Sequence, residues 1–395
     1  MNLSIGIGCS QRENVVHAAE EAAERAKEAL GEGRIDLAIV LSTPHYSPGE
    51  VIPIIESGLN QTRIIGGTTA GIILPEALQR KGIAVVVFHS DTVRFQSFYA
   101  THLKLKNLKE AGNAFVKDTS TTFSQRDRKF LMFFFDGLLE NMSQFISGIE
   151  KELGDYFPIL AAGNSDLLSF SQTTQYHNNA ASSASTCGAI LGGDIDIYMS
   201  KRHGWKPLGK PRLVKKAKDN IIEKIGHEPA LQLYEDFFKD NLGALKNDVF
   251  GKLNARYPLG ILSRHKQEYL IRNVVDILED GSLVCQDKVP VGSEIHLMIG
   301  NKNSCLQSAA QAAQDLKKQL GNAVPQLLLI FESTMRWQIL KHSWAEEMKT
   351  ITDVIGNDFP MIGMLTYGEI FKPGKLLQPG QNFLLSGNIM LMAIV

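Results

Sequence analysis

The stretch Ile64-Ile-Gly-Gly-Thr-Thr-Ala-Gly-Ile-Ile-Leu74 decides the fold, because related stretches recur at two later places in the chain. These are Ile159-Leu-Ala-Ala-Gly-Asn-Ser-Asp-Leu-Leu168 and Met361-Ile-Gly-Met-Leu-Thr-Tyr-Gly-Glu-Ile370. Each begins with two large apolar residues, as a buried strand should, and continues into small residues that let the backbone approach a neighbour or a ligand. We therefore expect one strand-and-turn element to occur three times.

Apolar runs flank each copy in the same order. Runs that end in polar residues precede the copies at 37–43, 131–137 and 327–334, and apolar runs follow them at 82–88, 187–192 and 388–395. A helix-length segment separates each preceding run from its turn. The pattern predicts an α/β fold of mixed β-sheets covered by helices, built from repeated strand, helix, strand, turn, strand units.

The length of 395 residues exceeds what one hydrophobic core usually serves, so two domains are expected. Residues 200–218 combine glycine and proline with eight lysine and arginine residues. This composition predicts a basic linker between an N-terminal domain, 1–199, and a C-terminal domain, 219–395.

Composition narrows the class of protein. Hydrophobic residues make up 44% of the chain, and 41 basic residues balance 42 acidic ones, so nucleic acid is not an expected partner. No apolar run is long enough to span a membrane, and the amino terminus does not resemble a signal peptide. Cys9, Cys187, Cys285 and Cys305 are widely spaced, which indicates reduced thiols and a cytoplasmic protein.

The turns offer groups that suit a small polar ligand. Glycines at strand ends present backbone N–H groups with little obstruction, and nearby hydroxyl, amide and carboxylate groups add partners for amines or carboxylates. Two arginines are candidates for binding a carboxylate, although each also fits a structural ion pair. The candidate ligand-binding residues are Gly66, Gly67, Thr68, Thr69, Gly71, Asn164, Asp166, Arg272, Arg336, Thr366, Tyr367, Gly368 and Glu369. The alternative is that the glycines only allow close strand packing.

Catalytic motifs are scarce. The chain has no Ser-His-Asp order, Walker loop, His-Glu-x-x-His helix or metal-ligand cluster, and the Gly6-Ile-Gly8 segment lacks the third glycine of a dinucleotide fingerprint. We predict no cofactor and no metal. An enzyme using Cys9 or Asp166 in the pocket, or a scaffold that binds only proteins, remain the alternatives to a ligand-binding module.

The polar stretch 169–186 lies between the second turn and its closing strand. Loops of this length in compact domains are usually functional or disordered. We expect a binding loop, in which Tyr176 and His177 supply groups that close over a pocket.

Several motifs together resemble the paired FIST N and FIST C domains. They are Gly66-Gly-Thr-Thr-Ala-Gly71, the basic junction, Pro229-Ala-Leu-Gln-Leu-Tyr234, Tyr269-Leu-Ile-Arg272 and Gly363-Met-Leu-Thr-Tyr-Gly-Glu-Ile370, in the family's order over nearly the whole chain. The resemblance implies an intracellular sensory module that binds small ligands such as amino acids and acts with a signalling protein. Independently of the resemblance, equivalent turns in the two halves predict a pocket between the domains, formed by the glycine-rich turns of both.

Overall fold

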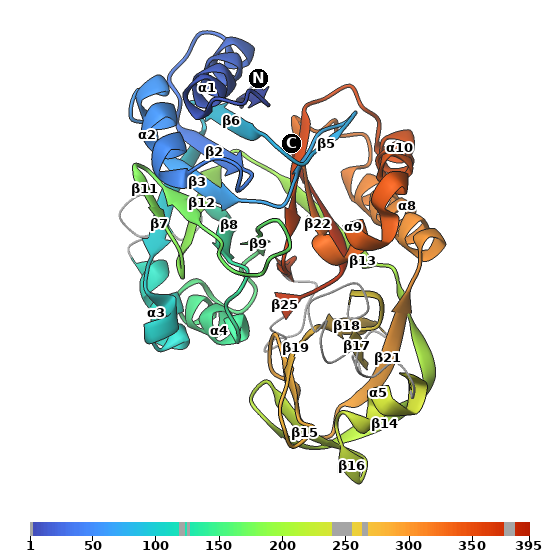
Figure 1. The fold of residues 1–395 in the computed structure, drawn as a ribbon. Helices are drawn as coiled ribbons and strands as arrows, with labels where there is room; N and C mark the ends of the chain where they lie inside the picture. The colour runs from blue at the N-terminus through green and yellow to red at the C-terminus, as the bar shows by residue number, and fades with distance from the viewer. Residues whose placement is uncertain (1–2, 118–122, 125–126, 239–254, 263–267, 375–383) are drawn as a thin grey trace.

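The computed structural model describes residues 3–117, 123–124, 127–238, 255–262, 268–374 and 384–395 (Figure 1). Three six-stranded sheets form the body, and a fourth, eight-stranded sheet lies to one side. The predicted α/β class with mixed sheets is confirmed, because every sheet of the body combines parallel and antiparallel pairs and is covered by helices.

Unit 1 spans residues 4–89 and provides the first sheet. Its elements are β1 (Ser4–Ser10), α1 (Val15–Leu30), β2 (Leu37–Ser42), α2 (Pro48–Gly58), β3 (Ile64–Thr68), β4 (Ile72–Ile73), β5 (Leu78–Gln79) and β6 (Ile83–His89). The apolar runs predicted as strands form β2 and β6. Helix α1 is rich in alanine and buries most of its alanines against the sheet.

Unit 2 spans residues 93–193 and repeats this order. Its elements are β7 (Val93–Ala100), the short helix η1 (Leu103–Leu105), α3 (Leu108–Phe115), β8 (Arg128–Asp136), α4 (Met142–Leu153), β9 (Ile159–Asn164), β10 (Gln175–His177), β11 (Ala180–Ser182) and β12 (Thr186–Gly193).

Unit 3 comprises residues 197–203 and 302–394. Its elements are β13 (Ile197–His203), α8 (Lys302–Leu320), β22 (Leu327–Ser333), α9 (Thr334–Leu340), the short helix η4 (Lys341–Ser343), α10 (Trp344–Ile355), β23 (Met361–Thr366), β24 (Glu369–Lys372), β25 (Leu384–Leu385) and β26 (Asn388–Ile394). No helix in the described ranges is long and apolar enough to cross a membrane.

The three sheets share one strand order, and each borrows a hairpin from another unit. In the first sheet the order is β1-β6-β2-β3, followed by the β10–β11 hairpin of unit 2. In the same way the β24–β25 hairpin of unit 3 joins the sheet of unit 2, and the β4–β5 hairpin of unit 1 joins the sheet of unit 3. The three turns singled out in the sequence are the points where the chain leaves one sheet for the next. Each hairpin exchange therefore ties two units together.

In the stretch 169–186, Tyr176 and His177 do not close over a pocket as we predicted, although Phe170 and Ser171 line the cavity described below. Residues 175–182 form the β10–β11 hairpin, in which the Tyr176 side chain is buried and its hydroxyl lies 2.6 Å from Ser42 Oγ. The His177 ring stacks on Tyr99 with ring centroids 4.9 Å apart. Tyr176 therefore packs unit 2 against unit 1, and His177 packs against β7 of its own unit.

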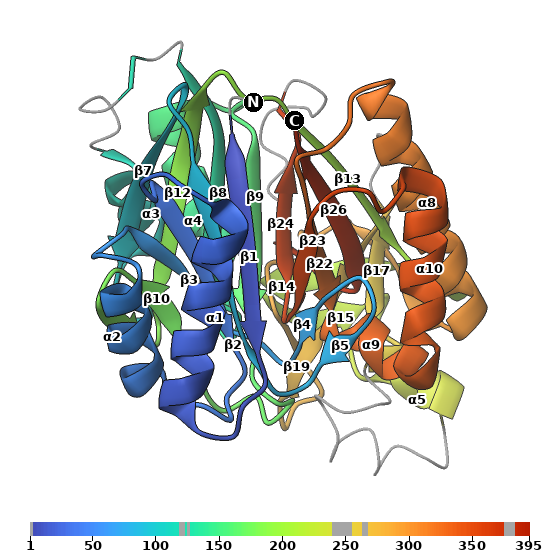
Figure 2. The same ribbon diagram turned by 90° about the horizontal axis from the view of Figure 1, so that it is seen from above.

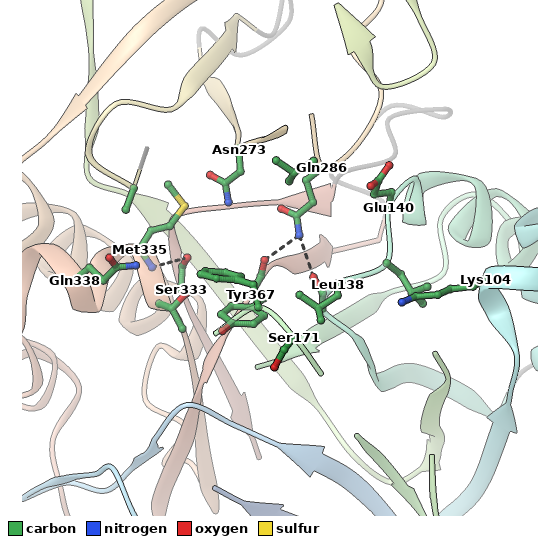
Figure 3. Close-up of a pocket in the computed structure, with 16 residues that line it drawn as sticks. Lys104, Leu138, Glu140, Ser171, Asn273, Gln286, Ser333, Met335, Gln338 and Tyr367 are labelled. Atoms are coloured by element: carbon green, nitrogen blue, oxygen red, sulfur yellow. Dashed lines mark hydrogen bonds between the residues drawn. The ribbon is translucent and has the colours of Figure 1, made fainter. Parts of the chain in front are cut away.

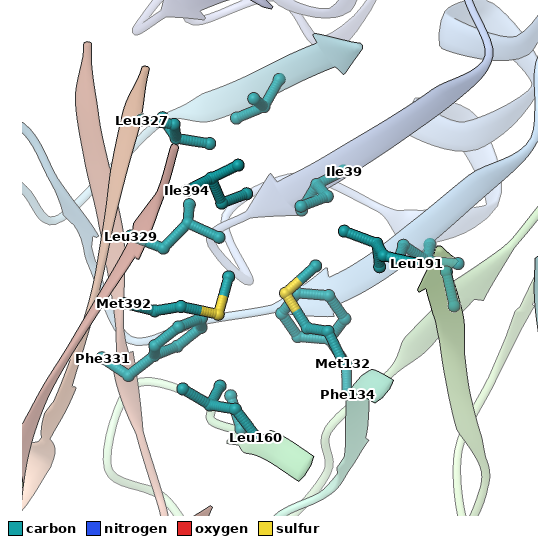
Figure 4. Close-up of a cluster of buried hydrophobic side chains, with 14 of the residues drawn as sticks. Ile39, Met132, Phe134, Leu160, Leu191, Leu327, Leu329, Phe331, Met392 and Ile394 are labelled. Carbon is teal, nitrogen blue, oxygen red and sulfur yellow. The ribbon is translucent and has the colours of Figure 1, made fainter. Parts of the chain in front are cut away.

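The inner faces of the three sheets meet in one hydrophobic core (Figure 4). Side chains from all three units pack there, among them Ile39, Phe134, Leu160, Phe331 and Met392. The helices lie on the outside of the sheets, as Figure 2 shows, and separate hydrophobic clusters fill the space between each sheet and its helices. The amino- and carboxy-terminal halves thus share a core, which makes the body a single packed structure.

The described residues between 205 and 300 form a sheet inserted between β13 and α8 of unit 3, called here the inserted sheet (Figure 1). Its elements are β14 (Trp205–Lys218), β15 (Ile221–Ile225), β16 (Glu228–Pro229), α5 (Gln232–Phe238), β17 (Leu259–Leu262), β18 (Tyr269–Arg272), β19 (Val274–Ile277), β20 (Leu283–Cys285) and β21 (Glu294–Gly300). It has its own hydrophobic cluster.

The prediction of a linker at 200–218 was wrong, because this segment lies in β13 and β14. The lysines of β14 occupy exposed positions, so the strand lacks the apolar alternation that reveals a strand in a sequence. Pro207 lies where β14 pairs only with β21, and Pro211 lies in the irregularity of that pairing between Leu208 and Arg212, since β15 pairs from Val214 onward. A proline is tolerated where one strand edge is open.

Candidate functional site

The three turns that follow β3, β9 and β23 meet inside the body. The Thr69 hydroxyl donates a 2.8 Å hydrogen bond to the Leu365 carbonyl, and the Ser165 hydroxyl donates a 2.6 Å bond to the same oxygen. The Ala70 N–H in turn donates to Ser165 Oγ. The predicted turns therefore lie together, but they bond to one another and are buried, and Gly71 packs among them.

The polar residues at the ends of β3 and β9 have protein partners. Asn164 donates from Nδ2 to the Thr68 carbonyl at 3.0 Å and accepts from Gln175 at 3.3 Å. Thr68 Oγ1 accepts from the N–H of Thr174, while Gly67 pairs with Gln175 across the sheet. These groups hold β9 and β10 against β3, so they do not stand open to a ligand.

Asp166 organises the loop that follows β9. Its carboxylate accepts hydrogen bonds from the backbone N–H groups of residues 169–172, from the Ser169 hydroxyl at 2.9 Å and from the Tyr367 hydroxyl. Burial alone would raise the pKa of Asp166, but the hydrogen bonds from Tyr367 and the loop hold it below its ordinary value. An ionised carboxylate with this many donors anchors a loop and has little capacity to act as a general acid.

The two candidate arginines are structural. Arg336, on α9, forms a fully buried ion pair with Glu347 and donates to Ser308 Oγ at 2.8 Å and to the Cys305 carbonyl at 3.0 Å. Arg272, at the end of β18, donates to the Leu384 carbonyl and so joins the inserted sheet to β25. Neither guanidinium reaches the cavity described below.

Glu369 is fully buried beside Thr366, whose hydroxyl donates to its carboxyl oxygen. Burial raises the pKa of Glu369 to about 8, against the opposing effect of the Thr366 hydrogen bond. The group is therefore mainly protonated near neutral pH, which makes it a poor partner for an amine.

This titration predicts a pH effect on stability. The unfolded chain ionises Glu369 from about pH 4.3, whereas the folded chain keeps it protonated to about pH 8, so stability falls by about 1.4 kcal/mol per pH unit across this window. Glu369→Gln should remove that slope and keep the acceptor for Thr366. Urea unfolding between pH 5 and 9 measures it, with the exposed Glu24→Gln as the control that should retain the wild-type slope. Identical slopes in wild type and Glu369→Gln would refute the assignment.

A cavity of about 240 Å³ lies where units 2 and 3 meet the inserted sheet (Figure 3). Unit 2 contributes the segment after β8, the η1 helix and the loop held by Asp166; unit 3 contributes the end of β22, α9 and the turn after β23. The lining residues are Lys104, Gly137, Leu138, Leu139, Glu140, Phe170, Ser171, Ala255, Asn273, Val275, Gln286, Ser333, Thr334, Met335, Gln338 and Tyr367.

Of the residues predicted to bind a ligand, only Tyr367 lines this cavity. Its ring stacks on Phe170 with centroids 4.5 Å apart, and its hydroxyl is fixed by Asp166. Asp166 does not line the cavity itself. It positions both rings of the stack, because it accepts hydrogen bonds from the Phe170 N–H and the Tyr367 hydroxyl.

Gln286 fixes the inserted sheet over the cavity. Its Nε2 donates to the Tyr367 carbonyl at 2.9 Å, and its Oε1 accepts from Ser386 Oγ at 2.9 Å. A side chain at Gly368 would come within 3.0 Å of this amide, so the glycine leaves room for it. Nearby, Ser143 at the start of α4 donates to buried Asp287 at 2.7 Å. The wall made by the inserted sheet is thus held by bonds to both units.

Opposite charges stand on one side of the cavity. Lys104 and Glu140 both line it and both are exposed, and Figure 3 shows them on the side away from Gln338. Lys104 has no ion-pair partner within the part of the chain that the structure describes. The sequence analysis did not single out Lys104 or Glu140. The available signal was the polar end of the runs 131–137 and 327–334, since Gly137 and Ser333 at these ends line the cavity.

Cys9 does not support the nucleophile alternative. Burial raises the pKa of its thiol to about 11, against the smaller effect of Arg25, so the thiolate is rare at neutral pH. Neither Cys9 nor Asp166 lines the cavity. Across the described ranges, His, Cys, Asp and Glu side chains form no group of three that could hold a metal.

Comparison with protein families identifies the class. The FIST N domain matches residues 36–228 and the FIST C domain matches residues 230–372, so this chain belongs to the FIST family. FIST domains are sensory, ligand-binding domains of signal transduction. The resemblance found in the sequence is confirmed, and the family boundary falls next to β16 of the inserted sheet.

Solved structures give more remote likenesses, and a search of curated proteins finds no match. A chorismatase is 9% identical, with 100% of this chain and 99% of that chain covered and a TM-score of 0.38. A cyanuric acid hydrolase is 7% identical over the whole of both chains with a TM-score of 0.32, and the enzyme from A. caulinodans is 10% identical over 48% of this chain and 71% of its own, with a TM-score of 0.29. Likenesses this remote do not define a function.

Proposed function

We propose that this chain is a sensory module that binds a small polar ligand, such as an amino acid, in the cavity between unit 2, unit 3 and the inserted sheet. The observation that carries the proposal is the cavity itself, which two units and the inserted sheet line together. Junctions of this kind are where small-molecule sites are commonest. A ligand there contacts all three parts, so its binding stabilises their arrangement, which is what a signalling partner can detect.

The charges suit a zwitterion. Lys104 offers a cation for a carboxylate, and Glu140 offers an anion for an ammonium group, with one Glu140 oxygen already held by Asn220 at 2.7 Å. The Tyr367 and Phe170 rings with Met335 give the middle of the cavity an apolar surface for the rest of the ligand. In this account the predicted turn residues support the site, and Tyr367 is the one that touches the ligand.

Thermal denaturation with each amino acid tests the proposal. A ligand at 100 times its Kd should stabilise the protein by about 2.7 kcal/mol. Lys104→Ala and Glu140→Gln should each weaken binding about tenfold, the loss of about 1.4 kcal/mol expected for one charged contact. Lys106→Ala is the matched control, since Lys106 is an exposed neighbour that does not line the cavity.

The alternatives give different results. A scaffold for proteins should show no stabilisation by any small molecule. An enzyme should convert the bound compound, whereas a sensor should release it unchanged, which mass spectrometry of the recovered ligand decides. Equal binding by wild type, Lys104→Ala and Glu140→Gln would move the site away from this cavity.

A further inference from the structure

The polar end of the run 37–43 is the one that the cavity does not use. The corresponding ends of the other two runs line the cavity, but among the described residues none from unit 1 does. The connection from β5 to β6 lies beside this unused end, because the Thr43 N–H donates to the Gly82 carbonyl at 3.0 Å. This connection carries Arg80 and crosses from the sheet of unit 3 to the sheet of unit 1.

Arg80 is fixed by an aromatic ring and not by a carboxylate. Its guanidinium carbon lies 4.1 Å from the centroid of the Trp337 ring of α9, a cation–π contact that leaves the N–H donors unused. Within the described ranges Arg80 has no ion pair and no hydrogen bond. The nitrogen Nη1 is buried, but the side chain as a whole is only partly buried, so Nε and Nη2 are the donors that a ligand can reach.

The surroundings of Arg80 favour a negative ligand. Burial lowers the pKa of Arg80, against the smaller effect of the Tyr367 hydroxyl, because its charge is partly removed from water. The next residue, Lys81, is already paired with Glu13. Burial, Lys81 and Arg80 lower the pKa of His45, against the opposing effect of Glu13, so positive potential prevails at this strand end. A cation that is partly removed from water is stabilised by a counter-ion.

We propose that Arg80, held against Trp337, binds an oxyanion, a carboxylate or phosphate group, at the junction of units 1 and 3. Nε and Nη2 share one edge of the guanidinium, and two parallel donors match two oxygens of such a group. The site is separate from the cavity, because neither Arg80 nor Trp337 lines it. It lies against the same helix, since Met335 and Gln338 of α9 do line the cavity.

Nuclear magnetic resonance of the tryptophan side chains tests the proposal on the intact protein. Titration with inorganic phosphate, with sodium chloride holding the ionic strength constant, should shift the Trp337 indole signal in a saturable way, because the anion binds the guanidinium that covers this ring. Trp337→Phe assigns the signal. The indole groups of Trp205 and Trp344 donate to the Ala255 carbonyl and to Glu332, and their signals should not move.

Variants of Arg80 identify the binding group. Arg80→Gln should abolish the saturable shift, and Arg80→Lys should weaken phosphate binding about tenfold, because lysine keeps the charge but loses the planar pair of donors. Arg63→Gln is the matched control, since Arg63 is an exposed arginine of the same unit, and this variant should bind phosphate as wild type does. If Arg80→Gln does not fold, Arg80→Lys provides the comparison.

Further titrations distinguish the sources of the oxyanion. Tighter binding of acetate than of phosphate supports a carboxylate ligand. Tighter binding of a peptide with one phosphoserine than of inorganic phosphate supports a site for a partner protein, and equal binding supports one for a free phosphate compound. A linear shift that wild type and Arg80→Gln share, or no shift with any anion, would overturn the inference. Neither outcome affects the proposed function, which depends on amino acid binding in the cavity.

Discussion

Gly66→Val should destabilise the whole protein by about 4 kcal/mol, through steric overlap and a strained backbone together. A Cβ at Gly66 would lie 2.0 Å from the Val40 carbonyl oxygen of the parallel neighbour β2, and the backbone has φ +142°, which favours glycine. Gly363 has the same place in unit 3, where a Cβ would lie 2.0 Å from the Ile330 carbonyl oxygen of β22. The glycine that opens the repeated turn is therefore needed for strand packing.

Heat or urea denaturation of the ligand-free protein measures this effect. Gly49→Ala is the control, because its new Cβ would have Ser47 Oγ as nearest neighbour at 4.0 Å in helix α2, where alanine is favoured over glycine. That variant should be as stable as wild type or slightly more stable. If Gly66→Val keeps wild-type stability but loses ligand binding, the glycine is a binding residue and our assignment of it is wrong.

Arg336→Met should destabilise the protein by about 3–5 kcal/mol, because it leaves the Glu347 carboxylate buried without a counter-ion. Glu332 lies in the same cluster and accepts from Trp344 Nε1 at 2.9 Å; burial and the neighbouring Glu347 raise its pKa well above the ordinary value. A protonated Glu332 is neutral, so it cannot serve as the counter-ion of Glu347. In this cluster the positive charge of Arg336 is therefore what balances the Glu347 carboxylate.

Two further variants sharpen this prediction. The double variant Arg336→Met/Glu347→Gln should recover part of the lost stability, since it removes the stranded charge. Lys349→Ala breaks an exposed ion pair with Asp353 on α10 and should cost no more than about 0.5 kcal/mol. Equal melting temperatures for Arg336→Met and Lys349→Ala would show that the buried pair contributes no more than a surface one.

Local patterns predicted the elements of the body well. Apolar runs gave β2, β8 and β22, because this signal comes from residues close together in the chain. The hairpin exchanges could not be predicted in this way. The partner of β4 is β23, in which Gly363 pairs with Ile73 across a separation of 290 residues (363 − 73), and the sequence of Ile72–Ile73 fits any sheet edge.

The candidate site shows the same division. The turns were predicted to come together, and they do, but the sequence could not reveal that Thr69, Ser165 and Leu365 satisfy one another. The cavity depends on where the inserted sheet docks, which Gln286 and Asp287 fix through contacts with both units. The exposed lysines of β14, the first strand of the inserted sheet, made that strand resemble a linker in the sequence. The wall of the cavity that carries Asn273 was therefore not predicted.

The central claim is that a small polar ligand occupies the cavity between unit 2, unit 3 and the inserted sheet. Hydrogen exchange of the intact protein, with and without the amino acid that stabilises it most, tests the claim directly. We predict slower exchange at once in residues 137–140, 273–275 and 333–338, which are distant in sequence and line the cavity together, with no change in α1. Protection confined to other segments, or none in any of these three despite bound ligand, would contradict the account.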